Sequence, residues 1–113
     1  MTKMYDDKEM NDLRAAFEDR VLRFPLVTMK RMFGSPCYLA ADSLFAFLVT
    51  EGVVLTCLDE PMRDRARAEL DARAFESAGK TMRTWMLVPA ENETDLDRIM
   101  PYAHASYEAA LAK

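Results

Sequence analysis

The segment from Leu26 to Leu58 constrains the fold most, because apolar stretches alternate there with turn-forming residues. Four stretches have the length and composition of β-strands, at residues 27–33, 37–41, 44–50 and 53–58. Between them stand Gly34-Ser35-Pro36, Asp42-Ser43 and Glu51-Gly52, which are typical of tight turns. Because such short connections join neighbouring strands, the segment predicts an antiparallel meander of about four strands.

The centre of this sheet is predicted to be apolar on both faces. Strict alternation places Leu44, Ala46 and Leu48 on one face and the residues between them on the other. Helices of the expected lengths cover only one face, so we expect the second to be closed by a homodimer or another protein. The alternative is a strongly twisted sheet that wraps its own helices over both faces. The residues expected on a ligand or partner surface are Tyr38, Phe45, Phe47, Val49, Val54 and Trp85.

Three segments have helical periodicity. In the first, apolar residues follow at spacings of three and four from a cap at Asp6 or Asp7, and Pro25 ends the pattern. The second is expected to begin at Asp59 with Pro61 in its first turn. The third is expected after Asn92 or Thr94, the latter spaced from Asp97 as in a capping box. The buried stripes are expected at Met10, Leu13, Phe17, Val21 and Phe24, at Met62, Ala66 and Leu70, and at Leu96, Ile99, Ala103, Tyr107 and Leu111.

The last two strands are predicted at a short extended piece near Phe75 and at Met82 to Val88, joined by a Gly79-Lys80 turn. The element order is then helix, three or four strands, helix, two strands, helix. This order predicts one α+β domain over residues 1–113, with a two-layer arrangement of an antiparallel sheet packed by helices.

Composition limits the partners and the compartment. The 113 residues carry a net charge of −4, which disfavours binding to a phosphate backbone. Cys37 and Cys57 stand in apolar runs and are expected to be free thiols. The start of the chain carries acids and no apolar core of a signal peptide, and no apolar run is long enough to span a membrane. We therefore expect a cytoplasmic protein without membrane contact.

Residues that could support catalysis or cofactor binding are sparse. His104 could pair with Glu108 as metal ligands, but an exposed histidine beside an acid is the commoner arrangement. A nucleophilic pair would need Cys37 or Cys57 beside His104, and burial makes a thiol less reactive. The stretch 78–81 resembles the end of a phosphate-binding loop, but position 74 is alanine where that loop needs glycine. We expect no enzymatic activity, no metal and no cofactor.

The pentapeptide Lys30-Arg31-Met32-Phe33-Gly34 resembles the KxMFG signature of the N-terminal domain of the TfoX/Sxy family of competence regulators. The order of elements is similar to that family over roughly residues 8 to 112. The resemblance implies an α-β3-α-β2-α arrangement akin to the secretion-chaperone fold. The chain departs from the family at Ser35-Pro36, where relatives usually have a second glycine, and at Thr84-Trp85, where paired tyrosines are common.

Three functions are open at this point. The first is a non-enzymatic regulatory or protein-interaction module, which the family resemblance implies. The second is a small-ligand binding domain with a pocket between sheet and helices, lined by Phe33, Tyr38 and Trp85. The third is weak DNA binding through a local basic patch of Lys30, Arg31, Lys80 and Arg83.

Overall fold

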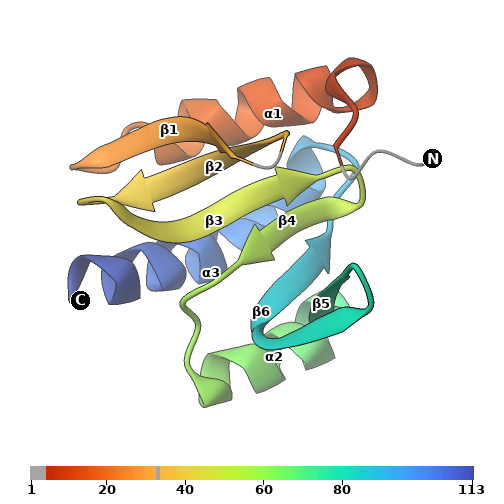
Figure 1. The fold of residues 1–113 in the computed structure, drawn as a ribbon, viewed down its shortest axis with the longest axis vertical. Helices are drawn as coiled ribbons and strands as arrows, with labels where there is room; N and C mark the ends of the chain where they lie inside the picture. The colour runs from red at the N-terminus through yellow and green to blue at the C-terminus, as the bar shows by residue number, and fades with distance from the viewer. Residues whose placement is uncertain (1–4, 33) are drawn as a thin grey trace.

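The computed structural model describes residues 5–32 and 34–113, and within them three helices pack on one six-stranded sheet (Figure 1). The elements in chain order are α1 (Asp7–Val21), β1 (Val27–Met32), β2 (Ser35–Ala40), β3 (Ser43–Val49), β4 (Gly52–Leu55), α2 (Glu60–Leu70), β5 (Arg73–Ser77), β6 (Lys80–Pro89) and α3 (Glu93–Leu111). The α+β class and the antiparallel sheet packed by helices are confirmed.

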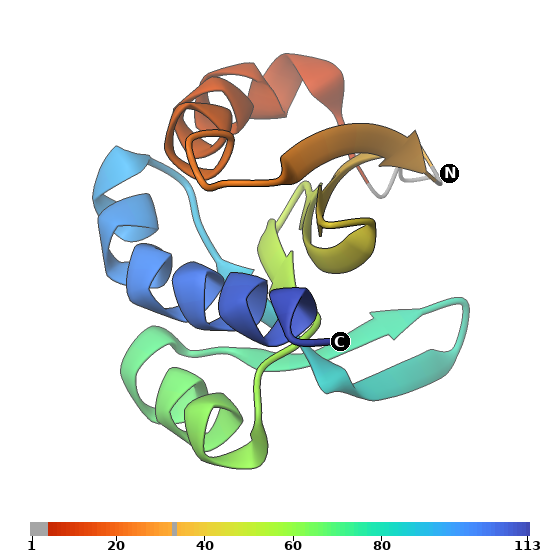
Figure 2. The ribbon, with the colours of Figure 1, turned by 90° about the vertical axis from the view of Figure 1, so that its left-hand side faces the viewer.

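The sheet is antiparallel throughout, with strand order β1-β2-β3-β4-β6-β5. Strand β6 therefore lies between β4 and β5. It joins the β5–β6 hairpin to the meander formed by β1 to β4. Figure 2 shows the three helices on one side of the curved sheet. The opposite side, here called the helix-free face, carries no helix of the described chain.

The helix starts follow from side-chain caps. Asp6 accepts hydrogen bonds from the Lys8 and Glu9 amides, and Asp59 accepts one from the Met62 amide. At α3 the predicted Thr94–Asp97 box is wrong. Asn92 caps the helix by accepting from the Asp95 amide. Asp97 instead pairs with Arg20 of α1 at 2.8 Å, which ties the two helices together.

The main core lies between the helices and the sheet, and the predicted stripes supply it. Two polar contacts fix the helices to the strands. Tyr38 of β2 donates a hydrogen bond of 2.7 Å to Glu18 of α1. The buried Ser106 of α3 donates to the Phe45 carbonyl at 2.7 Å and accepts from the Cys57 amide at 3.0 Å.

Each two-residue hairpin turn lies one position earlier than predicted, at 41–42, 50–51 and 78–79. In the first and last of these, both turn residues have positive φ. Ala41 and Ala78 accept this conformation although they have side chains, because the paired strands on either side fix the turn. Gly34, in the β1–β2 connection, has a positive φ of 77°.

No helix of the described residues is long and apolar enough to cross a membrane. Cys37 and Cys57 are both free thiols. Cys37 is buried on the helix-free face, and Cys57 packs at the edge of the main core.

Candidate functional site: an apolar cleft on the helix-free face

A second apolar cluster lies on the helix-free face of the sheet. Its buried members are Cys37, Phe47, Val49, Val54, Phe75 and Leu87. Strand pairing builds a row across four strands, since Cys37 stands opposite Phe47, Phe47 opposite Val54, and Val54 opposite Leu87. Residues paired in this way point to the same face. The prediction that both faces of the sheet centre are apolar is therefore confirmed.

This cluster is sheltered by the sheet itself. The second half of β6 pairs with β4, from Met86 to Pro89, while its first half has β5 as its one partner among the described strands. A register shift between Ala74 and Phe75 separates the two halves. Such irregularities bend a strand, and Figure 1 shows β6 sharply bent there. In Figure 2 the tip of the β5–β6 hairpin projects to the side away from the helices.

The bend leaves a cleft of about 300 Å³ between the hairpin and the ends of β1, β2 and β3. The wall formed by the ends of β1, β2 and β3, here called the first wall, contributes Met32, Ser35, Cys37, Leu44 and Phe47. The β5–β6 hairpin contributes Phe75, Ser77, Lys80, Met82 and Trp85. The volume is at the lower end of the range for small-molecule sites, and the lining is mostly apolar, as in those sites.

Aromatic rings form the inner surface of the cleft. The ring of Phe47 meets Phe75 edge to face, with centroids 5.3 Å apart, and meets Trp85 in the same manner at 5.5 Å. Phe47 and Phe75 are buried, whereas Trp85 is half-buried. The three rings hold one another in place, so the cleft has a defined aromatic wall.

Two polar side chains of the first wall differ in their hydrogen bonding. The Cys37 thiol donates to the Ser35 carbonyl at 3.5 Å, and burial raises the pKa of this thiol above its ordinary value. Cys37 is therefore a protonated, poorly nucleophilic group. Ser35 is 1% exposed, and its hydroxyl has no hydrogen-bond partner among the described residues.

The residues predicted for a ligand or partner surface divide between the two faces. Phe47 and Trp85 line the cleft, and Val49 and Val54 belong to the same apolar cluster. Tyr38 and Phe45 lie in the main core under the helices, and this corrects the prediction.

The physical reason for the Phe45 error is a bulge. The β2–β3 register passes from Tyr38 opposite Ala46 to Leu39 opposite Leu44, which leaves Phe45 as an extra residue. An extra residue reverses the alternation on one side of it, so Phe45 and Ala46 both belong to the main core. The sequence contains no glycine or proline at this point that would have indicated the bulge.

The residues of the family-like pentapeptide are spread over the first turn and its flanks. Lys30 and Arg31 are exposed on β1, and Met32 lines the cleft. Gly34 is exposed in the following turn, and Phe33 lies outside the described residues. Of the predicted pocket between sheet and helices, Tyr38 lies in the core, whereas Trp85 opens into the cleft on the other face.

Sequence reasoning missed Ser35, Phe75, Lys80 and Met82 as residues of one site. The predicted turn at Gly79-Lys80 indicated a hairpin. Only the bend in β6 brings that hairpin toward Met32 and Leu44, and no sequence pattern reports this bend.

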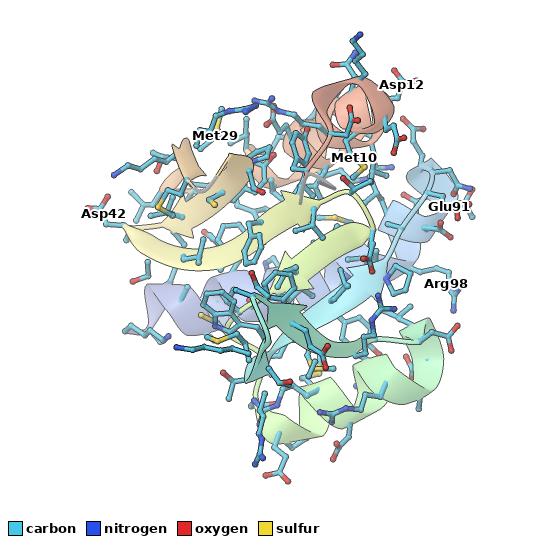
Figure 3. The ribbon with its side chains drawn as sticks, turned by 45° about the vertical axis from the view of Figure 1, so that its right-hand side comes forward. Met10, Asp12, Met29, Asp42, Glu91 and Arg98 are labelled. Carbon is cyan, nitrogen blue, oxygen red and sulfur yellow. The ribbon has the colours of Figure 1, made fainter. Side chains whose placement is uncertain are left out.

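Other features offer less as a site. A larger depression of about 910 Å³ lies between α1 and the start of α3, but it is open and polar. Figure 3 shows two of its acids, Asp12 and Glu91, on the same side of the molecule. His104 pairs with Glu108 at 2.8 Å, and the described residues contain no group of three metal-binding side chains. Lys30 and Arg31 are neighbours on one strand and so point to opposite faces, which splits the basic patch.

No protein-family model, curated protein or solved structure matches this chain.

Proposed function

We propose that this protein is a non-enzymatic binding module that holds a small apolar group in the cleft on its helix-free face. The observation that carries the proposal is the cleft itself: a concave, aromatic-walled site of about 300 Å³ that opens between a hairpin and three strand ends. Its polar groups are few, as in sites that bind a small ligand chiefly by its apolar surface. The protonated state of Cys37 favours binding over nucleophilic catalysis.

The proposal includes a regulatory role and a cytoplasmic location. The resemblance of residues 30–34 to a family of regulators supports the first. The two free cysteines support the second, because most cysteines in the cytosol remain reduced.

The position of Trp85 provides a direct test. It is the protein's one tryptophan, so tryptophan fluorescence reports on the cleft alone. Titration with 3-phenylpropanol, a small neutral apolar probe, should change this fluorescence in a saturable manner. It should also raise the melting temperature, because a ligand that binds only the folded state stabilises it.

A matched pair of methionine variants identifies the site. Met82 lines the cleft and is 36% exposed, and Met29 is 40% exposed on β1, at the opposite edge of the sheet (Figure 3). Met82→Glu should abolish the response, because probe binding would desolvate a carboxylate. Met29→Glu should retain it. An equal response in both variants, or none in the wild-type protein, would contradict the proposal.

Self-association, or binding to another protein, is the second candidate function, and a different observation favours it. A homodimer through the second face of the sheet would require exposed apolar side chains there, but the central side chains of that face are buried within the single chain. The exposed large apolar side chains include Leu22, Leu26 and Met29, which lie together in the sequence around the start of β1. Leu26 is 69% exposed and has a positive φ of 67°, which is strained for leucine.

A homodimer through this segment would bury these side chains. Light scattering at micromolar concentration should then give a dimer mass for the wild-type protein and a monomer mass for Leu26→Asp. Met82→Glu should remain a dimer, because Met82 lies on the hairpin and not in this segment. A monomer mass for the wild-type protein would exclude the homodimer.

A further inference from the structure

The cleft combines its apolar wall with one kind of charge. The chain has 19 acidic residues against 15 basic ones, yet the described residues that line the cleft include Lys80 and no acid. Lys80 both lines the cleft and is exposed, so its long side chain can hold the ammonium group in water at the rim. An anionic group at this rim would meet an attractive charge, whereas a cationic group would be repelled.

The inner part of the cleft offers a hydrogen bond. Ser35 stands two residues from Cys37 on β2, so both side chains point to the helix-free face. The Ser35 hydroxyl is buried and makes no hydrogen bond with the described residues. Buried hydroxyl groups in native proteins usually have a partner. A ligand atom that accepts or donates a hydrogen bond at this depth would supply one.

The cleft walls between Lys80 and Ser35 fit a ligand whose apolar part is flat or narrow. Phe47, Phe75 and Trp85 present ring edges and faces, which pack well on an aromatic ring or a short alkyl chain. The small volume excludes a large molecule.

We propose that the ligand of this cleft is a small organic acid with an apolar body, its carboxylate paired with Lys80 and its inner polar atom hydrogen-bonded to Ser35. This inference rests on the proposed function, since it names the chemical class that the same cleft prefers. The preference is modest, because Lys80 is exposed and exposed ion pairs contribute little.

Four probes of nearly equal shape test the proposal by Trp85 fluorescence: 3-phenylpropionate, 3-phenylpropanol, 3-phenylpropylamine and 3-(4-hydroxyphenyl)propionate. We expect the acid to bind about two- to fivefold more tightly than the alcohol. The amine should bind most weakly. The advantage of the acid should shrink as salt concentration rises, because salt screens exposed charges.

The charge is tested by Lys80→Gln, with Lys8→Gln on α1 as the control, because Lys8 lies on an element of the helix-covered side. In Lys80→Gln the acid and the alcohol should bind equally, and the affinity for the alcohol should be unchanged. In Lys8→Gln the preference for the acid should persist. Retention of the preference in Lys80→Gln would overturn the assignment.

The hydroxyl is tested by Ser35→Ala. The wild-type protein should bind the hydroxyphenyl acid more tightly than the unsubstituted acid, and this difference should disappear in the variant. The denaturation midpoint of the variant should be unchanged or raised, since the hydroxyl it removes has no partner in the described chain. A lowered midpoint would show that the hydroxyl serves the fold and would overturn its role in the ligand site.

The outcomes separate the two proposals. If none of the probes alters Trp85 fluorescence, the proposed function fails and this inference fails with it. If the alcohol binds as tightly as the acid in the wild-type protein, the cleft is a binding site but its preference for acids is refuted.

Discussion

At the scale of single residues, two glycines are required for different reasons. Gly34 has a φ of 77°, and a Cβ atom there would meet no heavy atom within 4 Å. Its constraint is backbone conformation alone. At Gly52 a Cβ atom would lie 2.1 Å from the Val88 carbonyl oxygen and 2.8 Å from the Ala90 amide nitrogen. These are backbone atoms of the neighbouring strand and its end, so they cannot move aside without opening the β4–β6 pairing.

Substitutions should separate these two causes. Gly34→Val should lower the free energy of unfolding by about 1–3 kcal/mol, the usual effect of strain in the left-handed region. Gly52→Ala should lower it by more, although the added group is smaller, because the clash displaces a strand. Urea denaturation of both variants checks the order. A Gly52→Ala midpoint above that of Gly34→Val, or an unchanged midpoint for Gly34→Val, would contradict this account.

At the scale of elements, the sequence was sufficient wherever one local pattern decides the structure. The apolar stripes of the helices and the capping residues Asp6 and Asp59 were predictable, because the hydrogen bonds of a helix and of its cap join residues that are close in sequence. The hairpins were predictable, but their turns were displaced by one residue. Which residue adopts positive φ depends on the pairing across the hairpin, as Ala41 and Ala78 illustrate. The bulge at Phe45 depends likewise on its partner strand.

One contact between elements should be visible in the pH dependence of stability. Tyr38 of β2 packs against α1. Its burial is the larger cause, and its hydrogen bond to Glu18 the second, of a pKa of the tyrosine hydroxyl well above the ordinary value. In the unfolded chain Tyr38 has an ordinary tyrosine pKa of about 10, so its hydroxyl loses the proton at a lower pH than in the folded protein. The stabilisation is therefore complete below about pH 10 and falls as the pH rises further.

The variant Tyr38→Phe should reveal this effect. At neutral pH it should be less stable by about 1 kcal/mol, because the hydrogen bond is lost. Between neutral pH and about pH 10.5 the wild-type protein should lose on the order of 1 kcal/mol more than the variant. Guanidinium denaturation at the two pH values gives the comparison. Equal losses in the two proteins would show that Tyr38 ionises as readily in the fold as in the unfolded chain.

At the scale of the whole molecule, the two apolar clusters share strands. Met86 and Val88 of β6 belong to the main core, while Leu87 between them belongs to the cluster on the helix-free face. The sequence predicted apolar residues on both faces but not how the second is sheltered. A curved sheet with a bent hairpin is the outcome of register and twist summed over six strands. No single segment of the sequence contains this information.

This sharing predicts a single cooperative unfolding transition. Trp85 fluorescence reports on the helix-free face, and far-ultraviolet circular dichroism reports mainly on the helices of the other face. Because β3, β4 and β6 supply both clusters, neither can be lost alone. The two signals should give the same urea midpoint. An earlier fluorescence transition would mean that the hairpin and its cluster form a separate unit.

The strand order also governs how the chain can fold while it is being synthesised. The meander β1–β4 emerges from the ribosome early, but its place in the sheet is completed only when β6 pairs with β4. Helix α3, which packs on Phe45 through Ser106 and Tyr107, emerges after all six strands. Until then the helix-free face of the nascent meander is bare and α1, which contacts β2 at Tyr38, covers only part of the other face, and such intermediates are prone to aggregation. The completed fold can therefore form only after α3 has left the ribosome, and the apolar strands of the meander stay exposed to other nascent chains until then.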